Sequence, residues 1–211
     1  MTLADSSAKV RPDLSDADVA AKIVRQAHEA AQTKEEFFAQ QAQKIAACCR
    51  AMAARIDQGA TVYCFGNGGS FSDALHMAVE FTHPIFEKRP ALPAVCLGTD
   101  SAHLTAVGND QDFSLAFAQQ LRIFAKRGDI AMGFSTSGKS ANVTRGLQAA
   151  REMGLLTIGY AGKDGGRLPA ACDHCFVVPS FSIPRIQETQ ETLLHIMWDM
   201  IHVLRGEEDV L

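Results

Sequence analysis

Apolar residues recur every three to four positions through the first part of the chain, between Ser15 and Gln58. This period is typical of helices that bury one face. An interruption near Thr33 and Lys34 divides the pattern, so the sequence predicts two helices packed against a larger body. The apolar positions are Val19, Ile23, Ala27, Ala30, Phe37, Phe38, Ile45, Met52 and Ile56.

Beyond residue 60, short apolar segments alternate with amphipathic ones. Strands are predicted at 61–65, 94–97, 129–134, 155–160 and 175–178, and helices at 70–81, 110–125, 140–153 and 185–204. This alternation, with short connections, is typical of a parallel sheet that helices cover on both faces. We therefore expect a three-layer α/β/α sandwich with a central parallel sheet and ligands at the carboxyl ends of its strands.

The length and hydrophobic content of the chain suit one domain with a full core, over residues 15–211. Within it we expect N-terminal helices over 15–58, the sheet core over 60–180 and a C-terminal helix over 185–205. Residues 1–14 mix acidic and basic side chains without an apolar run. A secretory signal needs such a run, so this segment is interpreted as a flexible N-terminal tail.

The charge distribution argues against nucleic acid and membrane as partners. Twenty Lys and Arg residues oppose 24 Asp and Glu residues, for a formal net charge of −4, and no run of like charge breaks the mixture. Apolar stretches such as 130–134 and 155–161 are far shorter than the ~18 residues that suggest a membrane span. We expect a soluble protein that holds any anionic ligand locally.

Six cysteines in a chain of this size suit small buried side chains in a reducing compartment, which favours the cytoplasm. Cys172 and Cys175 form a CxxC motif. A second CxxC or CxxH that would complete a zinc site is missing, as is the strand and helix order of a thioredoxin. We interpret the motif as chance spacing.

Two polar loops follow predicted strands. Gly66-Asn67-Gly68-Gly69-Ser70 leads from the first strand into a helix, where backbone N–H groups can point at an anion. A tight turn with Ser70 as an ordinary N-cap is the alternative. The segment Ser135–Ser140, with four hydroxyls and a glycine before a helix, predicts a phosphate-binding loop more strongly. It lacks the GxxxxGK[ST] spacing of a Walker A motif.

Histidines and carboxylates recur at helical spacing on two of the predicted helices. His76 and Glu80 share one helical face, while Gln187, Glu191 and His195 recur at every fourth position of the last helix. His, Glu and Gln side chains from the two helices could ligate a divalent metal such as zinc. Taken singly, each histidine has the alternative of a salt-bridged or core residue.

The motifs together carry a resemblance. In order along the chain they are GNGGS, a helix with HMAVE, VGND at 107–110, STSGKSAN at 135–142, GKDGG at 162–166 and RIQE at 185–188, with a His eight residues after its Gln. This order is similar to the phosphoheptose isomerase family of SIS (sugar isomerase) domain proteins, over nearly all of residues 60–204. The resemblance implies the SIS fold and the isomerisation of sedoheptulose 7-phosphate to D-glycero-D-manno-heptose 7-phosphate, a precursor of lipopolysaccharide or capsule heptose.

The resemblance also implies roles for individual residues. Glu80 and His195 would be the catalytic acid/base pair. Zinc, one ion per subunit, would be bound by His76, Glu80, Gln187 and His195. The phosphorylated sugar would be bound by Asn67, Gly68, Gly69, Ser70, Glu80, Asn109, Asp110, Ser135, Thr136, Ser137, Ser140 and Gln187. The family further implies a homotetramer whose active sites are lined by more than one subunit.

Some positions depart from the pattern of other family members. Pro184 replaces an Asp, Gln190 replaces a His, and His83-Pro84 replaces a Gly-Arg or Ser-Arg pair. Two alternatives therefore stay beside the phosphoheptose isomerase hypothesis. One is a non-catalytic SIS-fold regulator that binds a replication-initiator protein, against which Glu80 and His195 argue. The other is an isomerase or sensor for another sugar phosphate.

Overall fold

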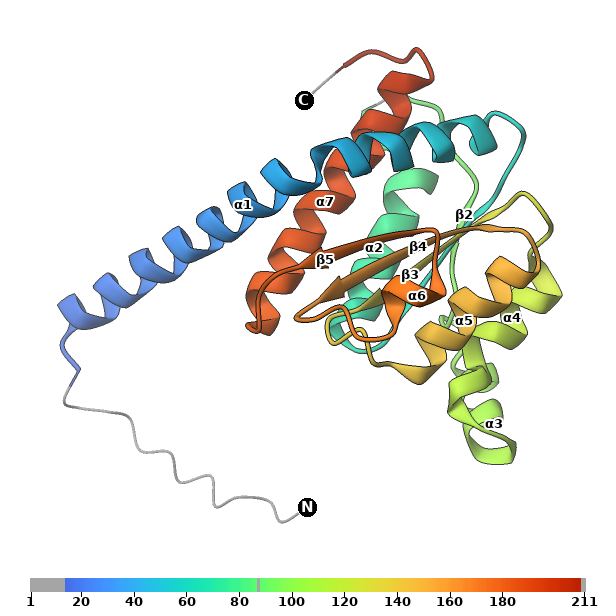
Figure 1. Ribbon diagram of the computed structural model, residues 1–211, viewed down its shortest axis with the longest axis horizontal. Coiled ribbons are helices and arrows are strands. Elements are labelled where there is room, and N and C mark those ends of the chain that lie inside the picture. The colour runs from blue at the N-terminus through green and yellow to red at the C-terminus, as the bar shows by residue number, and fades with distance from the viewer. Residues whose placement is uncertain (1–13, 87, 210–211) are drawn as a thin grey trace.

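The structure is a computed structural model that describes residues 14–86 and 88–209. The tail expected over residues 1–14 lies outside the described residues except for Leu14. The described chain folds around one five-stranded sheet, with helices on both of its faces (Figure 1).

The N-terminal region is a single helix, α1 (Asp16–Ile56), of 41 residues. The expectation of two helices was wrong, because no glycine or proline interrupts this segment. The Thr33 hydroxyl donates to the Glu29 carbonyl 2.8 Å away, so Thr33 is accommodated within the helix. Ser15 begins the helix with a capping box completed by Asp18.

The sheet is entirely parallel, with strand order β2-β1-β3-β4-β5. Every residue of β1, β3 and β4 is buried, which explains why these strands read as continuous apolar runs in the sequence. The bounds are β1 (Val62–Gly66), β2 (Ala94–Cys96), β3 (Ile130–Ser135), β4 (Leu156–Gly162) and β5 (His174–Val178). They lie close to the predicted segments.

Helices cover the sheet as two outer layers, which confirms the three-layer α/β/α sandwich. On one face, α2 (Gly69–Thr82) and α7 (Ile183–Leu204) pack with the second half of α1 over a core that includes Met77 and Trp198. The opposite face is covered by α4 (Ala116–Phe124), α5 (Ala141–Glu152) and the short α6 (Leu168–Ala171). Figure 1 shows the two layers on either side of the strands.

The helix predicted over 110–125 was wrong in its first part. That region contains the end of α3 (Ser101–Asp110), a short 3-10 turn η1 (Phe113–Leu115) and α4. Asp112 separates them, because its side chain accepts a hydrogen bond from Ser114 N at 2.9 Å and starts a new turn. Helix α3 has its own cap in Asp100, whose carboxylate accepts from His103 N at 3.0 Å.

The strand order places two loops next to each other. From β1 the chain crosses to β2 on one side and returns to β3 on the other side of β1. The carboxyl ends of β1 and β3 therefore meet at the point where the direction of winding reverses, the usual ligand position in open parallel sheets. The loops at these ends are 67–68 and 136–140.

Candidate active site

The two polar loops predicted from the sequence are joined by a reciprocal pair of amide hydrogen bonds. Asn67 Nδ2 donates to Asn142 Oδ1 at 2.9 Å, and Asn142 Nδ2 donates to Asn67 Oδ1 at 2.8 Å. Asn142, in the first turn of α5, was not among the predicted site residues. Its place at the end of the STSGKSAN motif was the available signal in the sequence, and the structure shows that it is buried, with 4% exposure.

Both helices that follow these loops begin without a side-chain cap. Helix α2 has Gly68 at its N-cap, and helix α5 has Ser140, whose side chain accepts no hydrogen bond from the helix. The Ser140 hydroxyl instead lies 2.9 Å from the hydroxyl of Ser135. Free N–H groups and the positive ends of two helix dipoles thus remain at adjacent positions, an arrangement suited to an anion such as phosphate.

The GKDGG segment at 162–166 packs against the loop 135–140. Gly138 has a positive φ of 62°, and a Cβ added there would lie 2.0 Å from the Gly165 carbonyl oxygen. Arg167 N donates to the Gly138 carbonyl at 2.8 Å. Only glycine fits this close approach, so the segment after β4 fixes the shape of the 135–140 loop.

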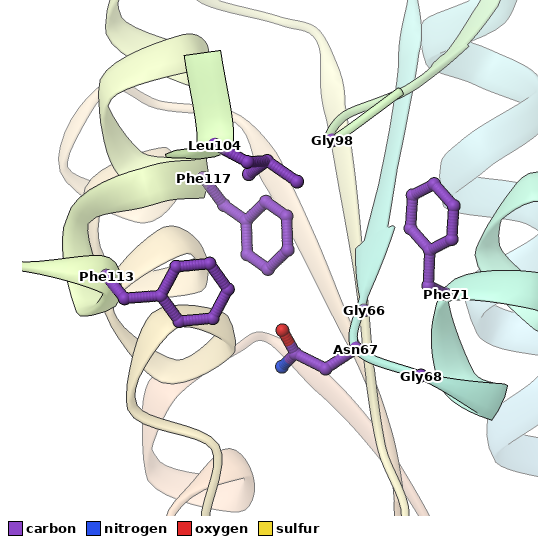
Figure 2. A pocket seen from close by; sticks show the side chains of 8 residues that line it. All are labelled: Gly66, Asn67, Gly68, Phe71, Gly98, Leu104, Phe113 and Phe117. Carbon is purple, nitrogen blue, oxygen red and sulfur yellow. The ribbon is translucent and has the colours of Figure 1, made fainter. Parts of the chain in front are cut away.

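A cavity of about 260 Å³ opens beside the first loop. Figure 2 shows the Asn67 side chain projecting toward it from the end of β1, with Phe113 and Phe117 on the opposite wall and Phe71 beside the loop. The amide offers polar contacts in a largely aromatic surrounding, a combination typical of small-molecule sites.

Asn109 and Asp110, which the resemblance implies as sugar ligands, lie at the end of α3. Both are exposed, and Asn109 Nδ2 donates to Asp110 Oδ1 at 2.6 Å. Neither lines the cavity beside Asn67.

The structure brings together three of the four predicted metal ligands. Ligand atoms of His76, Glu80 and His195 all lie within 4.8 Å of one another. His76 Nε2 is 3.1 Å from Glu80 Oε1, and the rings of His76 and His195 lie edge to face with centroids 5.0 Å apart. Glu80 is only 8% exposed. The i, i+4 spacing on α2 and the packing of α2 on α7 produce this cluster.

Glu191 holds His76 from the other side. The Glu191 carboxylate is in hydrogen-bonding contact with His76 Nδ1. A carboxylate on one ring nitrogen fixes the tautomer and orients the other nitrogen, which here faces Glu80. The sequence placed Glu191 on the same face of α7 as Gln187 and His195, but it gave no reason to select Glu191 as a site residue.

Gln187 lies one turn before Glu191 and faces the start of α2. A Cβ added to Gly69 would lie 2.3 Å from Gln187 Nε2, so any larger residue there would displace the Gln187 amide. Gln187, His76 and the unpredicted Asp73 line one open pocket of about 420 Å³. Burial and the nearby Glu191 carboxylate raise the pKa of Asp73 to about 6, against the opposing effects of Gln187 and His76.

The donor set of the cluster suits zinc. Two imidazoles and a carboxylate are the ligands of many catalytic zinc sites, which keep a further position open. At metal–ligand distances of about 2.0–2.2 Å, a tetrahedral ion needs ligand atoms roughly 3.3–3.6 Å apart, and the 3.1 Å separation of His76 Nε2 and Glu80 Oε1 is close to this range. The Glu191 contact supplies the outer partner that zinc-bound histidines commonly have.

The cluster of His76, Glu80 and His195 and the two polar loops lie at different heights along the axis of α2. Ten residues separate Ser70 from Glu80, which corresponds to about 15 Å along a helix axis. The pocket with Gln187 and Asp73 lies between the two levels, since Gly69 and His76 both line it.

Two of the departures noted in the sequence have structural roles. Gln190 is 1% exposed and donates through Nε2 to the Ala161 carbonyl at 3.1 Å, which ties α7 to β4. Pro184 lies in the first turn of α7, where a proline has no hydrogen bond to lose.

Comparison with known proteins agrees with this arrangement. The SIS domain family matches residues 26–162. Phosphoheptose isomerase from Thermodesulfovibrio yellowstonii is 40% identical over 190 residues, 90% of this chain and 92% of that protein. Phosphoheptose isomerase from Desulfovibrio desulfuricans is 43% identical over 175 residues, 83% of each chain.

Solved structures show the same likeness. Phosphoheptose isomerase GmhA from Neisseria gonorrhoeae is 34% identical, with a TM-score of 0.81 over 88% of this chain and 99% of that one. A phosphoheptose isomerase from Francisella tularensis is 32% identical, with a TM-score of 0.82 over 87% of this chain and 97% of that one. The chain belongs to the phosphoheptose isomerase family of SIS-domain proteins.

Proposed function

We propose that the protein is an aldose–ketose isomerase that converts sedoheptulose 7-phosphate to D-glycero-D-manno-heptose 7-phosphate for heptose synthesis. The observation that carries this proposal is the cluster of His76, Glu80 and His195, within 4.8 Å of one another, in a chain 40% identical to a phosphoheptose isomerase. A regulator that only binds a partner protein has no need of such an acid/base cluster.

The phosphate of the sugar is bound at the loops after β1 and β3. The uncapped starts of α2 and α5 supply backbone N–H groups, and Ser137 and Ser140 supply hydroxyls. Asn67, Gly68, Gly69, Ser70, Ser135 and Thr136 complete this part of the site. Asn109 and Asp110 contact sugar hydroxyls, and Glu80 and Gln187 contact the reacting end.

The reaction moves one proton between neighbouring carbons. The Glu80 carboxylate removes a proton from C1 of the ketose, and an enediol forms as the C2 carbonyl oxygen gains a proton. His195 donates that proton to O2 and then accepts the proton of the O1 hydroxyl, and Glu80 returns its proton to C2 to give the aldose. Each positioned acid/base group typically contributes ~10²–10⁴-fold to the rate.

One zinc ion per subunit is proposed at His76, Glu80, Gln187 and His195. When bound, it would act as a Lewis acid that stabilises negative charge on the enediolate oxygens. The Glu191 contact keeps the His76 ring in the orientation that such binding requires.

We further propose that the protein works as a cytoplasmic homotetramer with active sites lined by more than one subunit, and that residues 15–211 form a single domain. Support for assembly comes from the separation of about 15 Å along α2 between the phosphate loop and Glu80. A neighbouring subunit can bring its own phosphate loops to the cluster. Among the described residues, no helix combines the length and apolarity required to cross a membrane.

The direct test is incubation of the purified protein with sedoheptulose 7-phosphate, with aldose formation followed by NMR. We expect the heptose product, and little turnover of hexose or pentose phosphates under the same conditions. Faster isomerisation of one of those shorter sugars would reassign the substrate. Absence of turnover with every sugar phosphate, in protein supplied with zinc, would favour the regulator.

A further inference from the structure

Cys172 and Cys175, whose CxxC spacing we interpreted from the sequence as chance, lie side by side at the edge of the sheet, and the proposed isomerase chemistry uses neither. Cys172 follows α6, and Cys175 is in the edge strand β5. Both sulfur atoms face Gly159 of β4, because a Cβ added there would lie 2.9 Å from Cys172 Sγ and 3.3 Å from Cys175 Sγ. The missing side chain of Gly159 makes room for the pair.

The turn between the two cysteines is held in place by its own hydrogen bonds. Asp173 Oδ2 accepts from Thr157 N at 3.0 Å and from Thr157 Oγ1 at 2.8 Å. Asp173 N donates to Thr157 Oγ1 at 2.9 Å. These three bonds anchor the Cys172–Cys175 turn to β4, so the sulfur atoms are kept close together rather than sampling separate positions.

The two thiols differ in access. Cys172 is only 6% exposed, and its Sγ lies 3.1 Å from the Leu168 carbonyl oxygen. Cys175 is half-buried and lies in the edge strand β5. A small solute therefore reaches Cys175 more readily than Cys172.

The thiols also differ in acidity. A hydrogen bond from the Cys172 thiol lowers the pKa of Cys175, against the opposing effect of burial. The same bond, together with burial, raises the pKa of Cys172. A thiolate is the reactive form of cysteine, and redox-sensitive cysteines are accessible, acidic and next to a second thiol.

The other four cysteines lack the access and the acidity of Cys175, although Cys64 and Cys96 are partners on neighbouring strands. All are buried, and burial raises the pKa of each of their thiols. They are Cys48, Cys49, Cys64 and Cys96. Reactivity toward an oxidant should therefore concentrate on one pair.

We propose that Cys175 and Cys172 are a peroxide-sensitive dithiol, in which Cys175 attacks and Cys172 resolves. The Cys175 thiolate attacks one oxygen of hydrogen peroxide, the O–O bond breaks, and the departing hydroxide becomes water on gaining a proton. The resulting sulfenic acid is attacked by the Cys172 sulfur, which loses its proton. A disulfide forms and a second water leaves, so two electrons pass from the sulfurs to the peroxide.

The proposal is tested by treating the folded protein with hydrogen peroxide, then denaturing it and alkylating the remaining thiols. Peptide mass spectrometry should find a Cys172–Cys175 disulfide and alkylation of the other four cysteines. In Cys172→Ser, oxidation of Cys175 should stop at the sulfenic acid, because no resolving thiol is present, and dimedone should trap this product. In Cys175→Ser, neither the disulfide nor the dimedone adduct should form.

Cys96→Ser is the matched control, because Cys96 is buried in β2 and far along the sheet from the pair. It should oxidise as wild type does. Melting curves identify any variant that fails to fold, and Cys→Ala at the same position then replaces it. The proposal is overturned if folded wild type forms no disulfide, if another pair forms it, or if Cys175 is not the residue trapped in Cys172→Ser. None of these measurements depends on isomerase activity.

Discussion

At the scale of single residues, the site depends on contacts between side chains of different helices. His76 lies between two carboxylates, Glu80 on its own helix and Glu191 on α7. The first contact follows from the i, i+4 spacing and was predictable. The second depends on how α7 packs against α2, which periodicity cannot give. The same holds for Asp73, which shares a pocket with Gln187.

Replacing Glu191 tests its role as the partner of His76. In Glu191→Gln the His76 ring loses a charged partner, so we expect zinc affinity to fall on the order of 10–100-fold. Chelator competition on the purified protein measures this without any assay of activity. Glu188→Gln is the matched control, since Glu188 is on the same helix but pairs with Arg185. Equal zinc affinity in both variants would refute the assignment.

His202 gives a prediction for the dependence of stability on pH. Its side chain is fully buried, and burial lowers its pKa in spite of the nearby Glu207. The unfolded state therefore binds more protons than the folded state between the two pKa values, so stability rises with pH in that range. The contribution of His202 to the free energy of unfolding should therefore decline as pH falls below about 6.5, the unfolded value, whereas the raised pKa of Asp73 changes stability in the opposite direction.

Urea unfolding between pH 5 and 8 measures this dependence. His202→Gln should lose less stability than wild type as pH falls, whereas His28→Gln, at an exposed position of α1, should follow the wild-type profile. The same pH profile in His202→Gln as in wild type would contradict the role of His202.

At the scale of elements, the fully buried strands were predicted correctly, and a helix with one buried residue was missed. Strands β1, β3 and β4 are buried throughout and were found from their apolar runs. Helix α3 was missed because Val107 is its only buried residue, so it carries no apolar period. The two polar loops were found from their composition. The hydrogen bonds that join them through Asn67 and Asn142 depend on the strand order, which the composition does not give.

A glycine-to-alanine substitution tests whether the GKDGG segment fixes the shape of the 135–140 loop. Gly138→Ala places a Cβ against the Gly165 carbonyl, so the loop must shift and KM for the phosphorylated sugar should rise. Gly59→Ala is the control, because Gly59 also has a positive φ but its Cβ would meet nothing within 4 Å. Both should lose about 1–2 kcal/mol of stability from backbone strain alone. An unchanged KM in folded Gly138→Ala would show that the GKDGG segment does not fix the shape of the loop.

At the scale of the whole molecule, the first half of α1 extends beyond the body of the protein (Figure 1). Val19, Ile23 and Val24 are 42%, 63% and 69% exposed, although they continue the apolar pattern of the buried second half. An exposed apolar face of this kind favours contact with another chain. It is consistent with the proposed homotetramer, which the sequence implied only through resemblance.

Changing this face should weaken assembly without unfolding the helix. Ile23→Glu places a charge on the exposed apolar side, and we expect a smaller species in sedimentation experiments with unchanged helical content by circular dichroism. Ala21→Glu adds the same charge at an exposed position on the opposite side of the helix and is the control. An unaltered sedimentation coefficient for Ile23→Glu would exclude this face from the interface.

The central claim is that Glu80 transfers the proton in an isomerase reaction. The measurement that tests it most directly is the kcat of Glu80→Gln with sedoheptulose 7-phosphate, in protein whose melting curve matches wild type. We expect kcat to fall by a factor on the order of 10²–10⁴, and the double variant with His195→Asn to lose much less than the product of the single losses. Near-normal turnover by folded Glu80→Gln would contradict the mechanism.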